Sequence, residues 1–142
     1  MNTYFSIKEA TEGYFEDKGS KFLAYTFPIF NEEDFKAALQ QVQELHPKAT
    51  HHCYAYRIGT DKNNYRANDD GEPSGSAGRP ILGQIDSFNL CNILSIVVRY
   101  YGGTNLGVSG LINAYKNATK DAFEKAKIIE KDIIQNMDVF CN

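Results

Sequence analysis

Three carboxylates in one short segment are the first residues whose spacing suggests chemistry. Asp69, Asp70 and Glu72 lie within the sequence DDGEPSGSAGRP, residues 69–80. Carboxylate oxygens at this spacing could hold Mg²⁺, although this ion also keeps waters and usually binds a phosphate of its substrate. Turn formation alone explains the Asp-Gly and Pro-Ser-Gly sequences in the segment, because these residue types favour turns without a ligand. Metal binding is therefore the weaker interpretation.

A second glycine-rich segment, GGTNLGVSG at residues 102–110, follows an apolar run and precedes a helical pattern. Backbone N–H groups at the start of that helix, around Gly107 to Leu111, favour an anion, and Arg79 or Arg99 could complete the site. The competing interpretation is structural, since glycines also permit a tight crossover from strand to helix. The residues favour neither interpretation over the other.

Hydroxyl groups and histidines raise the question of catalysis. The two loops hold four hydroxyl side chains, those of Ser74, Ser76, Thr104 and Ser109. His51 or His52 could act as a base, but the sequence contains neither GxSxG nor GxxxxGK[ST]. Adjacent strand residues point to opposite faces, so the two histidines cannot both bind one metal ion unless the strand has a bulge. They are better explained as hydrogen-bonded structural residues. We name no catalytic residue, metal or cofactor.

The elements that must position these loops follow from apolar periodicity. Ile93 to Val98 form a nearly unbroken run rich in β-branched residues, which predicts a central strand covered on both faces. Leu111 to Ala126 carry apolar residues, mostly alanine, at helical spacing, which predicts a helix lying close to a sheet. The same reasoning predicts strands at residues 11–17, 22–29, 49–59 and 65–68, and helices at residues 31–46 and 80–88.

Composition bounds the class of protein. The chain has 142 residues, 42% of them hydrophobic, which suits one compact domain with a substantial core. No apolar run approaches the ~18 residues of a membrane span, and the first residues lack signal-peptide features, so we expect a cytoplasmic location and no membrane partner. The three cysteines are scattered and indicate neither a disulfide framework nor a zinc site.

Charge limits the kinds of partner. The net charge of -3 argues against indiscriminate binding to nucleic acid, because that binding depends on neutralising phosphates with lysine and arginine. Nucleic-acid binding would therefore need a local basic patch. Candidates in or beside the glycine-bearing segments are Lys18, Lys21, Arg57, Arg66, Arg79 and Arg99.

Four stretches together resemble a known family. The segments DDGEPSGSAGRPIL (residues 69–82) and VVRYYGGTNLGVSGLINAY (residues 97–115) are similar to signatures of the IMPACT/YigZ family, formerly an uncharacterised protein family. KGSKF (residues 18–22) and ATHHCYAY (residues 49–56) match two further motifs in the expected order. The departures from the family pattern are Ser76, Tyr101, Ser109 and Asn113. Asn113 replaces a frequent arginine, which removes one cation from any anion site there.

The resemblance implies an α+β fold, a two-layer α/β sandwich like the second domain of ribosomal protein S-five. It implies an IMPACT/YigZ-type N-terminal domain over residues 1–136. Residues 137–142, beginning with Met137-Asp138-Val139-Phe140, would then start a truncated second domain of the ferredoxin-like, elongation factor G-like kind. The resemblance also implies a role around translation, since eukaryotic relatives bind an activator of the initiation-factor-two kinase, although with an additional N-terminal domain.

The function expected on these grounds is a non-catalytic binding or regulatory module associated with translation, with RNA, the ribosome or a translation-associated protein as partner. One alternative is a phosphate- or nucleotide-binding enzyme that uses the glycine-rich loop and Mg²⁺. Another is a purely structural protein-interaction domain. The candidate anion- or nucleic-acid-binding residues are Lys21, His52, Arg79, Arg99, Tyr100, Gly102, Gly103, Gly107, Ser109 and Gly110, and the candidate loop residues are Asp69, Asp70, Gly71, Glu72, Pro73, Gly75, Ser76 and Gly78.

Overall fold

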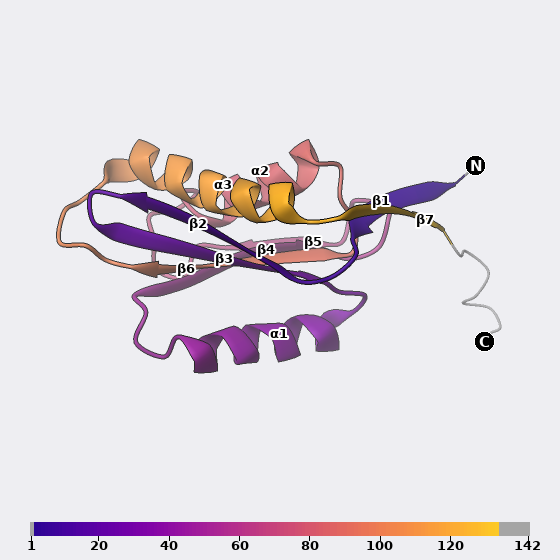
Figure 1. Cartoon of the computed structure of the whole chain (residues 1–142), viewed down its shortest axis with the longest axis horizontal. Coiled ribbons are helices and arrows are strands. Elements are labelled where there is room, and N and C mark those ends of the chain that lie inside the picture. The colour runs from indigo at the N-terminus through magenta and orange to yellow at the C-terminus, as the bar shows by residue number, and fades with distance from the viewer. Residues whose placement is uncertain (1, 134–142) are drawn as a thin grey trace.

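A computed structural model of the protein describes residues 2–133 as a five-stranded antiparallel sheet with helices on both faces and a separate two-stranded sheet (Figure 1). The strand expected to begin at Met137 lies outside the described residues. In chain order the elements are β1 (Thr3–Ile7), β2 (Thr11–Asp17), β3 (Ser20–Pro28), α1 (Glu32–Leu45), β4 (His51–Arg57), β5 (Tyr65–Asn68), α2 (Gly78–Ser87), β6 (Ile93–Tyr100), α3 (Gly107–Lys125) and β7 (Ile128–Asp132).

The predicted central strand is confirmed. β6 is the middle strand of the order β2-β3-β6-β4-β5, and every residue from Ile93 to Arg99 is buried. β-Branched residues suit this position because their side chains pack well on a pleated surface covered on both sides. The register places Phe22 of β3 and His51 of β4 opposite Arg99, so these strands bring their loop ends to the same end of the sheet.

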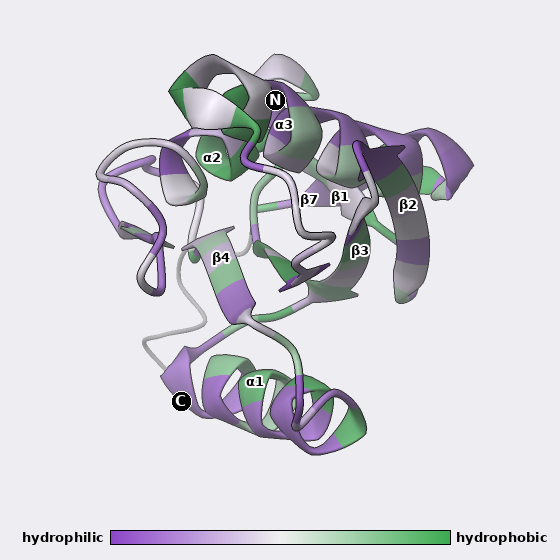
Figure 2. Cartoon of the chain, turned by 90° about the vertical axis from the view of Figure 1, so that its left-hand side faces the viewer, coloured by the Kyte–Doolittle hydropathy of each residue, from purple (hydrophilic) through white to green (hydrophobic). Residues whose placement is uncertain are grey.

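Helices pack on both faces of the sheet, as Figure 2 shows from the loop end, with α2 and α3 on one side and α1 on the other. The expected α+β fold of helices layered on a sheet is confirmed, with α1 added on the opposite face. The alanines of α3 permit a close approach to the sheet. A Cβ on Gly13 of β2 would lie 2.4 Å from the carbonyl oxygen of Ala118, so only glycine fits there. Asn31 caps α1, since its Oδ1 accepts a hydrogen bond from the Asp34 N–H at 2.8 Å.

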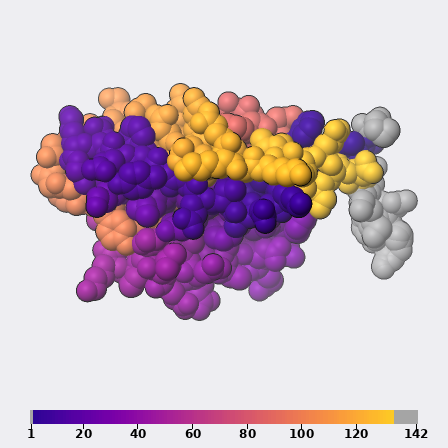
Figure 3. Space-filling view, in the orientation of Figure 1, coloured from indigo at the N-terminus to yellow at the C-terminus, as the bar shows by residue number. Residues whose placement is uncertain are grey.

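The two-stranded sheet was not anticipated from the sequence. β1 pairs antiparallel with β7, from Thr3 opposite Asp132 to Ile7 opposite Ile128. Figure 3 shows the late residues, in yellow, lying against the earliest ones, in indigo. β7 is mostly exposed and its partner lies at the other end of the sequence, so no local apolar pattern indicates it.

Among residues 2–133, no helix combines the length and the apolar character needed to cross a bilayer.

Candidate functional site

The four motif segments meet at one end of the sheet. β3 begins there with Ser20, β4 begins with His51, and β6 ends with Tyr100 (Figure 1, left). The loop of residues 69–77 joins β5 to α2 at the same end. The two glycine-rich loops singled out in the sequence therefore lie at the same end, and a carboxylate of the first bonds to the strand and the helix that flank the second.

Glu72 is that carboxylate, and it is a buried hydrogen-bonding centre. Arg99 Nη1 donates to Glu72 Oε1 at 3.0 Å and to Oε2 at 2.8 Å. The Tyr115 hydroxyl of α3 donates to Oε2 at 2.5 Å, and Arg99 Nη2 donates to Ser20 Oγ at 3.3 Å. The side chains of Glu72 and Arg99 are only 3% and 7% exposed. Arg99 is thus paired inside the protein, where its hydrogen bonds to Glu72 and Ser20 join two of the motif segments to β6.

Two further groups beside Glu72 are inert as nucleophiles. The Cys53 thiol lies 3.3 Å from the Tyr115 hydroxyl and 3.1 Å from the carbonyl oxygen of Asp69. Burial raises the pKa of the Cys53 thiol well above its usual range. Burial likewise raises the pKa of Tyr115, and the nearby Cys53 and Glu72 raise it further. Neither side chain ionises near neutral pH, so the centre holds no activated nucleophile.

The histidines occupy opposite faces of β4, as expected from strand alternation. His51 Nδ1 donates to the carbonyl oxygen of Asp70 at 2.7 Å, and its Nε2 lies 3.6 Å from Glu72 Oε1. His52 Nε2 donates to the carbonyl oxygen of His46 at 2.8 Å, on the face covered by α1. Both are hydrogen-bonded structural residues. The Tyr100 hydroxyl also lies on the α1 face, 2.6 Å from His46 Nδ1. His52 and Tyr100 therefore point away from the glycine-rich loops.

The three loop carboxylates face different donors. Asp69 Oδ1 accepts the N–H groups of Ala77 and Gly78 at 3.1 and 2.8 Å, and its Oδ2 accepts that of Gly75 at 2.9 Å. Burial alone would raise the pKa of Asp69, but these backbone donors bring it below its ordinary value. Asp70 Oδ2 accepts the His52 N–H at 2.7 Å, and Glu72 faces Arg99. In the described part of the chain, no three such ligands converge on a point that could hold a metal ion.

An exposed rim surrounds the buried centre. We define the rim as Lys18, Lys21, Tyr101 and the residues 102–110, all exposed except the half-buried Leu106 and Gly110. Two glycines bring its halves together. A Cβ on Gly102 would lie 2.1 Å from the backbone of Gly19, and the Gly102 N–H donates to Ser20 Oγ at 3.0 Å. The rim holds six of the predicted binding residues, Lys21, Gly102, Gly103, Gly107, Ser109 and Gly110. Lys21 lies opposite Tyr100 in the sheet, so its side chain points toward the α1 face.

The N-terminus of α3 opens onto this rim. The helix begins at Gly107, earlier than its apolar stripe indicates, because its first residues are exposed and carry no core pattern. No side chain caps it and no acidic residue lies in its first turn. Its first N–H groups and the positive end of its dipole therefore favour an anion in the adjacent solvent.

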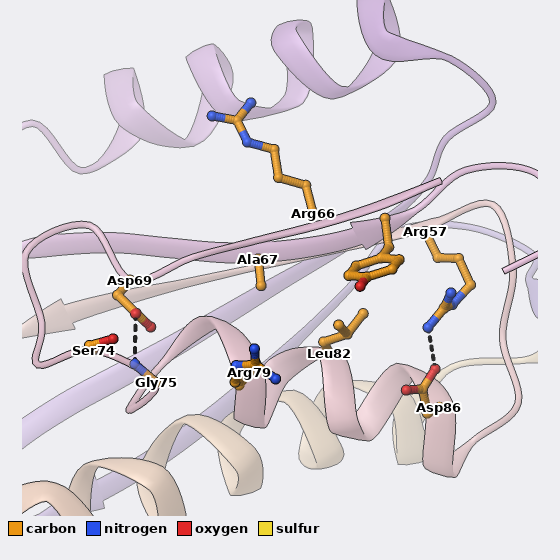
Figure 4. Close-up of a pocket in the computed structure, with 10 residues that line it drawn as sticks. Arg57, Arg66, Ala67, Asp69, Ser74, Gly75, Arg79, Leu82 and Asp86 are labelled. Carbon is orange, nitrogen blue, oxygen red and sulfur yellow. Dashed lines mark hydrogen bonds and ion pairs between the residues drawn. The ribbon is translucent and has the colours of Figure 1, made fainter. Parts of the chain in front are cut away.

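Arg79 lies elsewhere, in a cleft of about 540 Å³ between β5 and α2 (Figure 4). Asp69 and Gly75 line the same cleft from the loop. At its other end, Arg57 Nη2 pairs with Asp86 Oδ1 at 2.5 Å. Arg66, which belongs to β5, points to the opposite face of the sheet, toward α1 (Figure 4). The predicted site residues thus divide among the rim, the buried centre, the α1 face and this cleft.

Sequence reasoning missed the partners of the buried centre. Tyr115 and Ser20 lie within the motif segments 97–115 and 18–22, but neither is predicted as a site residue from the sequence. An available signal was the strand register, because pairing the predicted strands places Arg99 opposite both Phe22 and His51. The remaining loop residues Gly71, Pro73, Ser76 and Gly78 shape the segment. For example, Ser76 Oγ donates to the carbonyl oxygen of Pro73 at 2.6 Å.

Comparison with known proteins decides the family. A model of the Impact N-terminal domain matches residues 18–123, which include all four motif segments. The chain belongs to the IMPACT family. The resemblance drawn from the motifs is thereby confirmed.

Relatives within the IMPACT family are similar over most of this chain. YvyE of Bacillus subtilis (strain 168) is 34% identical over 96% of this chain and 63% of its own length. An IMPACT family member of Haemophilus influenzae is 39% identical over 94% of this chain and 64% of its own length. A crystal structure described as that of a hypothetical protein superposes with a TM-score of 0.88 at 34% identity, covering 93% of this chain and 65% of that one. The chain therefore spans less than two thirds of these proteins.

Proposed function

We propose that this chain is a non-catalytic binding module associated with translation, and that its rim binds the phosphate backbone of RNA. Membership of the IMPACT family supports the association with translation, since the motif resemblance implies that role. The contact between Gly19 and Gly102 carries the proposal for the site. It brings the exposed turn that carries Lys18 against the exposed loop that leads from Tyr101 to the open N-terminus of α3.

The rim combines the groups that single-stranded RNA requires. Two lysines can neutralise phosphates, and the helix N-terminus offers N–H donors to another. Tyr101 is 48% exposed and offers a ring face on which a base can stack. Because the whole chain has a net charge of -3, this local patch must supply the attraction, and the affinity should fall as salt screens it.

A salt titration tests the proposal. A fluorescent single-stranded RNA oligonucleotide is titrated with the protein at several salt concentrations. The Lys18→Gln/Lys21→Gln variant should bind about tenfold more weakly and reduce the slope of log affinity against log salt by about 1.4, as expected for two lost phosphate contacts on a single strand. The Lys116→Gln/Lys120→Gln variant is the matched control, because both lysines are exposed on α3 away from its N-terminus.

Two results would contradict the proposal. One is an affinity of the unmodified protein for RNA that does not change with salt. The other is an equal loss in the two double variants, which would indicate diffuse attraction to lysine anywhere on the surface.

A further inference from the structure

β5 gives the main sheet an open edge. The sheet has edge strands β2 and β5. The β2 edge is partly closed, because the Tyr14 N–H donates to the carboxylate of Asp121 on α3 at 2.9 Å. In β5, by contrast, Tyr65, Arg66 and Ala67 are all exposed. An exposed edge strand presents unpaired backbone groups to which another chain can bind.

The strand register identifies which backbone groups face outward. The Ile58 N–H donates to the carbonyl oxygen of Asn64 at 2.9 Å, one step before the pair Arg57 and Tyr65. Hydrogen-bonded and non-hydrogen-bonded pairs alternate along an antiparallel ladder. Arg66 and Asn68 therefore bond to β4, whereas Tyr65 and Ala67 direct their N–H and C=O groups toward the open edge.

Arginines flank this edge on both faces of the sheet. Arg66 lies on the α1 face, with its Cζ 5.6 Å from the ring centroid of Tyr54. Arg79 lies on the α2 face, in the cleft of about 540 Å³ beside β5 (Figure 4). Both are exposed, and neither forms an ion pair with a residue in the range 2–133. Successive side chains of an added strand would point alternately toward Arg66 and into the cleft.

We propose that the β5 edge binds an extended acidic protein segment, which adds to the sheet as a sixth strand. Tyr65 and Ala67 would pair with its backbone, and Arg66 and Arg79 would pair with its carboxylates. A peptide fits this edge better than RNA does, because it supplies both donors and acceptors, whereas a phosphate backbone supplies acceptors only. This inference is independent of RNA binding at the rim.

A binding assay with a defined probe tests the edge. The probe is a fluorescent eight-residue peptide that repeats glutamate-glutamate-valine-valine, so that glutamates point to both faces of the sheet. It is compared with a peptide of the same length in which lysine replaces glutamate. We expect the glutamate peptide to bind and the lysine peptide not to bind. The Arg66→Gln/Arg79→Gln variant should bind the glutamate peptide at least tenfold more weakly. The Lys116→Gln/Lys120→Gln variant should bind it as the unmodified protein does.

Ala67→Pro tests the backbone pairing itself. It removes an outward N–H while leaving the ladder to β4 intact, and proline is tolerated at such edge positions. A folded Ala67→Pro protein that still bound the peptide fully would overturn the proposal. If circular dichroism showed that Ala67→Pro is unfolded, the arginine double variant would provide the test instead. Undiminished peptide binding by that variant would also overturn the proposal. If single-stranded RNA displaced the peptide from the unmodified protein, the edge would be assigned to nucleic acid instead.

Discussion

At the scale of single residues, Glu72 joins segments that are far apart in the sequence. Its carboxylate receives donors from β6 and α3 and lies close to the first residue of β4. A buried carboxylate is stable only when such donors compensate for its lost hydration. The buried centre therefore stabilises the fold beneath the rim. For its residues, this is the role that the purely structural alternative predicts.

Removing the Glu72 carboxylate should destabilise the protein strongly. We expect Glu72→Ala to lower the free energy of unfolding by about 3–5 kcal/mol, because Arg99 is left buried without a partner. Urea unfolding measures the change. Lys125→Met, which breaks the exposed pair with Asp121, is the control and should cost less than about 1 kcal/mol. If Glu72→Ala lost no more stability than Lys125→Met, the stabilising role of the buried centre would be refuted.

Asp69 makes a pH-dependent contribution to stability. Its pKa in the folded protein lies below the ordinary 3.8, so the folded state favours the charged form. That contribution is fully present above pH 3.8 and is lost as the pH falls through the folded pKa. We expect Asp69→Ala to lose about 1–2 kcal/mol at pH 7, the usual value of a helix-capping side chain. The difference from the unmodified protein should shrink below pH 3.8 in acid titrations followed by unfolding. A difference in unfolding free energy that stayed constant with pH would show that the charge of Asp69 is not its cause.

At the scale of elements, the sequence predicted the main strands and helices because each has a local apolar period. β6 and α3 carry that signal most clearly. The contact between Gly19 and Gly102 has no such signal. Each glycine alone suggests a turn, and only the folded sheet shows that two turns touch. The same limit applies to the candidate site, since the sequence located its loops but could not show that Arg99 is buried and Lys21 exposed.

The glycine contact predicts a difference between two alanine substitutions. Gly102→Ala should destabilise by about 1–3 kcal/mol, because its Cβ would lie 2.1 Å from the backbone of Gly19 and force the turns apart. Gly83→Ala should be neutral or stabilise by up to about 1 kcal/mol, because Gly83 lies within α2 with nothing within 4 Å of its Cβ. Thermal unfolding measures both. Equal effects would disprove the steric argument.

At the scale of the whole molecule, stability should fall from the centre of the sheet toward its edge. β6 is buried between two strands and two helical layers, whereas β5 is exposed. Amide exchange reports such differences, because buried elements open only in larger unfolding events.

Hydrogen exchange should show this order residue by residue. We expect the slowest amides in β6 and rapid exchange at Tyr65 and Ala67, with slower exchange at Arg66 and Asn68, which bond to β4. Adding the glutamate and valine peptide should selectively slow the amide exchange of Tyr65 and Ala67. Uniform exchange along β5 would contradict the register from which the open edge was derived.

The pairing of β1 with β7 has a consequence for protein engineering. Because Thr3 lies opposite Asp132, the chain leaves the domain beside the place where it enters. Domains with adjacent ends tolerate circular permutation and insertion into a host protein. A short linker between these ends, with new ends opened at the exposed Thr104, would therefore keep every strand of the main sheet in place.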